Sequence, residues 1–327
     1  MKTAAFAVAL ATLGGLVACA GQAEDSRTEA PATGASYSSG LATTTTAGLI
    51  DCGGRSRVSA VGAIATDDGR EWIVPAQTSF GSAAIASDLY NDCGGMRLNA
   101  SDALDLDTIP LIDAGGSEEF VAYVFADNYF ELFVNGQLVG VDAVPFTPFN
   151  SSVVRFKADR PLTLAFKLVD WEEHLGLGME AGGLSRWHPG DGGLVAHFKD
   201  ADGETVAITD SSWRAQTFYT SPLRDRSCLK LAGAVRDSSD CDDGDAFDGS
   251  GFSAAFWPVP SDWATPGFDD SDWPQAAIYT NETVVVNNKP AFMNFTDLFD
   301  DPVADAQFIW SSNLILDNLV LARKTVD

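Results

Sequence analysis

The residues best suited to contact a ligand lie close together in one glycine-rich part of the sequence. The string WEEH occupies residues 171–174, and WH occupies residues 187–188. Sugars stack the C–H faces of their rings on aromatic side chains, and carboxylates and imidazoles exchange hydrogen bonds with hydroxyl groups. A carbohydrate-binding site is therefore predicted here, with a small loop core as the alternative. Its candidate residues are Trp171, Glu172, Glu173, His174, Trp187 and His188.

A second segment, residues 236–249, is rich in aspartate. Calcium takes roughly six to eight oxygen ligands, often from carboxylates in flexible loops. The segment therefore predicts a Ca²⁺ site, although its residue order differs from that of an EF-hand. The alternative is an acidic loop that keeps its charges in solvent. The candidate ligands are Asp237, Asp240, Asp242, Asp243, Asp245 and Asp248.

Transition metals and catalysis have less support in the sequence. The histidines are His174, His188 and His197, and their spacing matches no compact metal motif. No Gly-x-Ser-x-Gly elbow, His-Glu-x-x-His helix or Gly-Lys-Ser/Thr phosphate loop occurs. Glu172 and Asp210 would suit glycoside hydrolysis only at a suitable separation. A glycan-active enzyme is thus one alternative function, and a structural or protein-interaction module is another.

The cysteines indicate an oxidising compartment. Cys52, Cys93, Cys228 and Cys241 are an even set, and disulfides persist in exported proteins. Cys52 and Cys93 each lie in the string DCGG, whereas Cys228 and Cys241 flank the aspartate-rich loop. We expect these two pairs out of three possible pairings. No pair has the close spacing of a zinc site.

The elements that must position these residues are strands. Residues 119–141 are rich in β-branched and aromatic residues, with Asn135-Gly136 between two alternating runs, which predicts a hairpin with a type I′ turn. Long helical periodicity is absent. An all-β jelly-roll sandwich with long loops follows. Further strands are expected at residues 153–158, 162–169, 193–199, 205–209, 276–280, 308–310 and 314–323.

Several strings resemble a known module. ADNYFELFVNGQLVG (126–140), TDSSWR (209–214) and PGFDDSDW (266–273) are similar, in this order, to motifs of galactose-binding-like β-sandwiches. DWEEHLGLG (170–178) is a looser match. Such sandwiches are accessory domains of bacterial α-L-rhamnosidases and family 2 glycosidases, so the resemblance implies a glycosidase-type module without its catalytic barrel. We expect the tryptophans of the second and third motifs, Trp213 and Trp273, to be core residues.

The N-terminus is typical of an export signal. Lys2 precedes an apolar run at residues 4–16 that is too short to span a bilayer comfortably. The string LVAC, ending at Cys19, resembles the lipobox of bacterial lipoproteins, whose cysteine carries the lipid. Ala20 after that cysteine favours the outer membrane. A signal peptide with an incidental cysteine is the alternative.

Composition sets the remaining expectations. Residues 1–18 are the expected signal peptide, residues 19–48 a flexible Ser/Thr/Ala/Gly-rich tether, and residues 49–327 the sandwich. The formal net charge is −26, and such a field repels the phosphates of nucleic acids. The predicted protein is a lipid-anchored, carbohydrate-binding-like module with a glycan or polysaccharide as partner.

Replacing the predicted lipid acceptor tests the anchor. Because only the thiol of Cys19 can accept the lipid, Cys19→Ser is expected to release the protein from membranes into the soluble fraction. Fractionation followed by immunoblotting measures this. If the variant stays with the membrane as fully as the unaltered chain does, the lipobox interpretation is wrong.

Overall fold

The computed structural model describes Met1 and residues 34–53, 57–91, 93, 96–97, 104–146, 150–182, 186–286, 298–300 and 302–327. Contacts divide the chain into Met1–Ala30 and a second unit, Pro31–Asp327. In the described part of the chain, no helix has the length and apolar character needed to cross a membrane.

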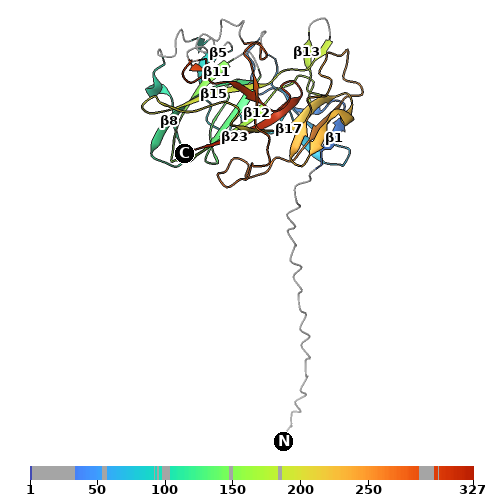
Figure 1. Ribbon diagram of the computed structural model, residues 1–327. Coiled ribbons are helices and arrows are strands. Elements are labelled where there is room, and N and C mark those ends of the chain that lie inside the picture. Colours follow the sequence, from blue (N-terminus) through green and yellow to red (C-terminus); the bar gives the residue numbers. More distant parts are fainter. Residues whose placement is uncertain are drawn as a thin grey trace. The chain divides into compact units, whose positions relative to one another are not determined.

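Two large sheets, mostly antiparallel, make up the body (Figure 1). The seven-stranded sheet has the order β1 (Ser36–Ser39), β20 (Ser253–Phe256), β17 (Arg214–Leu223), β23 (Asp317–Val326), β12 (Leu162–Val169), β9 (Tyr129–Val134), β10 (Gln137–Val141). The nine-stranded sheet has the order β21 (Ala277–Tyr279), β22 (Phe308–Trp310), β15 (Gly193–Asp200), β8 (Glu118–Asp127), β11 (Asn150–Ala158), β5 (Ser87–Asn91), β6 (Met96–Arg97). In this sheet, β16 (Thr205–Ile208) pairs with β15, and β7 (Leu111–Asp113) runs parallel to β11.

Three small sheets complete the described structure. One joins β2 (Thr43–Thr46), β3 (Val61–Ala65) and β4 (Glu71–Val74); the others pair β13 (Glu180–Gly182) with β14 (Arg186–His188) and β18 (Lys230–Ala232) with β19 (Val235–Asp237). The predicted all-β sandwich class is confirmed.

Alternation along the strands gives the seven-stranded sheet two different faces. In β12, Leu164 and Phe166 point into the main core between the sheets, and Ala165 and Val169 point to a second apolar cluster on the other face. Successive strand residues point to opposite faces, so this pattern requires cover on both sides. The second cluster takes in partly buried side chains of β3 and β4, which thus help to cover the outward face.

The predicted hairpin is confirmed, with a refinement. Asn135 and Gly136 have φ angles of 50° and 83°, as a type I′ turn requires, and join β9 to β10. The preceding run, β8, belongs to the other sheet. The predicted strands at 153–158, 162–169, 193–199, 205–209, 276–280 and 308–310 correspond to β11, β12, β15, β16, β21 and β22. The one expected at 314–323 begins at Asp317.

The predicted tether ends earlier than expected. Ser36 and Ser38 are buried on β1, which pairs with β20, and Thr43–Thr46 forms the exposed strand β2. The prediction of a flexible segment up to residue 48 is therefore wrong for residues 34–48, and residues 19–33 lie outside the described part. Main-chain pairing needs no large apolar side chain, and small serines fit under a sheet edge.

Both predicted disulfides are present. Cys52 and Cys93 have Cα atoms 5.0 Å apart, and Cys228 and Cys241 have theirs 5.1 Å apart. The first links the segment after β2 to that after β5, and the second closes the aspartate-rich loop against a 3₁₀ turn. Each bridge shortens a loop of the unfolded chain and so lowers its entropy.

Trp273 provides a test of the core. It is 7% exposed and lies edge-on to Phe218 and Phe268, with ring centroids 5.7 and 5.4 Å away. Trp273→Ala is expected to lower the free energy of unfolding by roughly 3–5 kcal/mol, because it leaves a cavity. Urea unfolding measures this loss. Phe247→Ala, at an aromatic residue that is 81% exposed, is the control, and an equal loss in both variants would contradict the core assignment.

Candidate functional site

A groove with a volume of about 480 Å³ crosses the outward face of the seven-stranded sheet. Its floor takes side chains from five neighbouring strands, β20, β17, β23, β12 and β9. The floor residues are Phe256, Phe218, Tyr219, Leu319, Lys167, Glu131 and Phe133. Alternation along the strands places Glu131, Phe133 and Lys167 on the outward face. In β17, where the register is irregular around Tyr219, the consecutive residues Phe218 and Tyr219 both line the groove.

One wall of the groove is the segment from Glu71 to Ser79. It begins beside β20, where the ring of Trp72 stacks on Phe256 with centroids 5.3 Å apart. Farther along, the main-chain oxygen of Gln77 accepts a hydrogen bond from the Lys167 ammonium of β12. At its end, the Ser79 N–H donates to Glu131 of β9. This wall thus runs across the strands.

The opposite wall is the segment from Trp257 to Trp263. It starts at the end of β20, where the Trp257 N–H donates to the Phe218 carbonyl at 3.0 Å. It reaches β9 where Trp263 meets Phe133 edge-on, with centroids 5.3 Å apart. Both walls therefore run between the same two strands, β20 and β9.

The groove contains a nearly buried ion pair. The Glu131 carboxylate accepts hydrogen bonds from the Tyr129 hydroxyl at 3.1 Å and the Ser79 hydroxyl at 3.4 Å. The Lys167 ammonium lies 3.7 Å from the same carboxylate, and burial lowers the pKa of Lys167. Trp257 also lines the groove, and its indole N–H is buried without a hydrogen-bond partner among the described residues. The groove thus combines aromatic rings with hydrogen-bonding groups.

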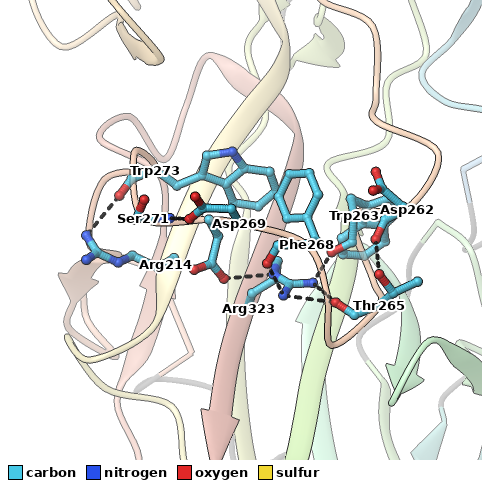
Figure 2. A network of polar contacts seen from close by, with 10 residues as sticks. Arg214, Asp262, Trp263, Thr265, Phe268, Asp269, Ser271, Trp273 and Arg323 are labelled. Atoms are coloured by element: carbon cyan, nitrogen blue, oxygen red, sulfur yellow. Dashed lines mark hydrogen bonds and ion pairs between the residues drawn. The ribbon is translucent and has the colours of Figure 1, made fainter.

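Arg323 of β23 holds the second wall in place (Figure 2). Its guanidinium is almost fully buried and donates to the carbonyls of Trp263, Thr265 and Phe268. Its Nε donates to the Asp270 carboxylate at 2.8 Å. The PGFDDSDW motif is therefore part of a turn wrapped around a buried cation.

The predicted ligand-binding residues fall into two groups, two that are buried and four that lie nearer the surface. Trp171 is 1% exposed, donates from its indole nitrogen to the Ala60 carbonyl at 2.9 Å and meets Tyr129 edge-on. Glu172 is also 1% exposed and accepts from the Tyr219 hydroxyl at 2.9 Å. The prediction that these two residues belong to a loop surface is wrong. Their strand-end position turns them toward the second apolar cluster.

The other four residues lie nearer the surface. His174 stacks on Trp187 with ring centroids 3.7 Å apart and an interplanar angle of 7°. A Cβ at Gly249 would lie 2.6 Å from Cζ3 of Trp187, so the backbone there also presses on this indole. His188 contacts Asp245 at 2.9 Å, and Glu173 accepts from the Ala181 N–H at 2.6 Å. The stacked His174 already covers one ring face of Trp187, where a sugar was expected.

The aspartate-rich loop lies beside these residues, since Trp187 and Ala246 exchange main-chain hydrogen bonds. Its carboxylates point to separate partners. Asp237, Asp242 and Asp248 accept N–H groups two residues ahead, Asp240 pairs with Lys230, and Asp242 also pairs with Arg224. Across the described ranges, no three His, Cys, Asp or Glu side chains form a group that could hold a metal ion. Calcium binding stays a prediction.

The groove residues were missed, although the sequence carries a signal for them. Glu131 interrupts an otherwise apolar strand, YFELFV, and Lys167 interrupts LTLAFKLV. A charged residue inside a buried strand is costly unless it is paired. Glu131 and Lys167 are opposite each other on neighbouring strands, so their side chains point to the same face of the sheet. Two charged residues on one face indicate that this face is not purely apolar.

Buried acids at one end of the sandwich make stability depend on pH. Burial raises the pKa of Glu172 to about 8, although hydrogen bonds from Gly176 and Tyr219 oppose the shift. Burial also raises the pKa of Asp142 to about 8. Nearby, burial and the charges of Asp127, Asp191 and Glu172 raise the pKa of Asp170. These groups favour the protonated form in the folded state.

Glu172→Gln tests this linkage. Since the folded pKa exceeds the unfolded value, the contribution of Glu172 is full below its unfolded pKa and is lost as pH rises through about 8. Between pH 6 and pH 9 the unaltered chain is expected to lose about 2–3 kcal/mol more stability than the variant, at 1.36 kcal/mol per pKa unit. Thermal melts at both pH values measure this. If both proteins lose the same stability between the two pH values, folding does not raise the pKa of Glu172.

Comparison of this chain with models of known protein families, with curated proteins and with solved structures finds no match. The resemblance to galactose-binding-like modules thus rests on its motifs alone.

Proposed function

We propose that this protein binds carbohydrate and that its ligand lies in the groove between Trp72 and Trp263. The observation that carries the proposal is the groove itself, at about 480 Å³, within the range typical of ligand sites. The chain would then act as a carbohydrate-binding module. Glu172 and Asp210, the pair considered for hydrolysis, contact different partners, Tyr219 for the former and Ser212 with Lys324 for the latter.

The groove lining has both kinds of group that sugars require. Trp72 and Phe133 are half-buried, so each keeps part of a ring accessible for stacking. Thr78, Ser79 and Lys167 supply hydrogen-bonding groups between these rings.

The groove also suits a ligand better than the predicted loop site does. Trp187 is stacked under His174, and Trp171 is buried. Trp72 also stacks on Phe256, but this ring and the half-buried Phe133 line a hollow of about 480 Å³. We therefore assign ligand contact to the groove and a local structural role to the loop tryptophans.

We further propose that the protein acts outside the cytoplasm, anchored through a lipid on Cys19 at the bacterial outer membrane. The two disulfides support an exported location, because such bonds persist in oxidising compartments. The strong negative charge of the chain argues against nucleic acid as a partner. An anchored module of this kind would hold polysaccharide at the cell surface or in the periplasm.

Aromatic truncation in the groove tests the function. Trp72→Ala and Phe133→Ala are each expected to weaken glycan binding about tenfold or more, because aromatic anchors dominate binding energy. A glycan array on the full chain identifies the ligand, and calorimetry then measures its affinity, with circular dichroism to confirm folding.

Trp187→Ala is the matched control, since it removes an indole from the predicted loop site and leaves the groove intact. We expect it to bind as the unaltered chain does. Normal binding by the groove variants together with loss in Trp187→Ala would move the site to the loop. Absence of any glycan ligand would refute the proposed function.

A further inference from the structure

We infer that the groove accepts a linear, uncharged chain of several sugars laid across the strands and that it rejects acidic polysaccharides. This inference rests on the proposed function and names the class of glycan. It follows from the length of the groove, the direction of its walls and the charges of its lining.

The floor sets the length. It takes side chains from five adjacent strands, β20 to β9. Neighbouring strands lie about 4.8 Å apart, so the four intervals between them span about 19 Å. A single sugar ring would fill only part of this distance, whereas an oligosaccharide would follow it.

The walls set the direction. Both run from β20 to β9, and one includes the edge strand β4, which pairs only with β3 among the described strands. Glu71, Trp72 and Ile73 all line the groove although successive side chains leave a strand on opposite faces. The groove therefore borders the edge of β4 and not one of its faces. An edge offers a regular series of main-chain donors and acceptors to a ligand that lies along it.

The lining charges set the class of chain. Glu71 is exposed in the groove wall, and Glu131 is buried in the floor. Among the described residues that line the groove, the cation is Lys167, which already contacts Glu131 and donates to the Gln77 carbonyl. The lining therefore carries a net negative charge, within a chain of formal charge −26. An anionic sugar would lose solvation there without gaining a free cation.

An extended peptide is the main competing occupant, because a strand could add to the edge of β4. The polar groups of the lining favour the glycan. Thr78, Ser79 and Lys167 give the groove hydrogen-bonding side chains, which hydroxyl groups along a glycan would meet. Binding of an extended peptide in place of a glycan is therefore one result that would contradict the inference.

The test compares neutral oligosaccharides of increasing length with chains of the same length that contain uronic acids. Calorimetry on the full chain is expected to show affinity that rises from one sugar to several and then levels off, with acidic chains at least about tenfold weaker. Glu71→Lys is expected to raise the ratio of acidic to neutral affinity several-fold, less so at high salt. Glu204→Lys, on the exposed β15–β16 turn of the other sheet, makes the same charge change and should leave the ratio unaltered.

The outcomes separate the two claims. If Trp72→Ala abolishes glycan binding but single sugars bind as tightly as chains, or acidic chains bind best, this inference is wrong and the proposed function stands. Equal shifts from Glu71→Lys and Glu204→Lys would also overturn it, since the effect would then come from overall charge. If an extended peptide binds, Trp72→Ala blocks it and no glycan binds, both claims are wrong.

Discussion

The seven-stranded sheet is covered on both faces, and this constraint shapes the rest of the molecule. Leu132 of β9 and Phe166 of β12 fill the space between the sheets, while Glu131 and Lys167, one residue away, face the opposite side. A slip of one residue in register would exchange these two sets and bury the charges in the main core. The same alternation that builds the sandwich therefore places the groove.

Arg323 connects the core of this sheet to a wall of the groove. Its neighbour Ala322 belongs to the main core, so the guanidinium projects to the outward side, where the 263–270 turn surrounds it. Burying a guanidinium is costly unless its donors are satisfied, and here three carbonyls and a carboxylate accept from it. The turn is thereby held against β23, and with it Trp263, which closes the groove near Phe133.

Sequence reasoning succeeded where the signal was local. The Asn135-Gly136 turn needs positive φ angles, and the repeated DCGG strings made the pairing of Cys52 with Cys93 the natural choice. It failed where packing decided. Trp171 and Glu172 look like exposed loop residues in the sequence, yet they are buried beside Tyr129 and Tyr219. The sequence around Trp171 and Glu172 does not show that other segments, among them β3 and β4, cover the outward face of the sheet.

The groove residues were also hard to predict, because the contact between them depends on strand pairing. Glu131 and Lys167 are 36 positions apart in the chain, yet their strands are neighbours and Glu131 is opposite Lys167 in the register. A buried ion pair is a poor source of stability, because two well-packed apolar side chains commonly do as well or better. Here the pair also holds one wall of the groove, because Glu131 accepts from the Ser79 N–H and Lys167 donates to the Gln77 carbonyl. The two charges that are costly to bury are thus the groups that fasten the segment from Glu71 to Ser79 to the sheet.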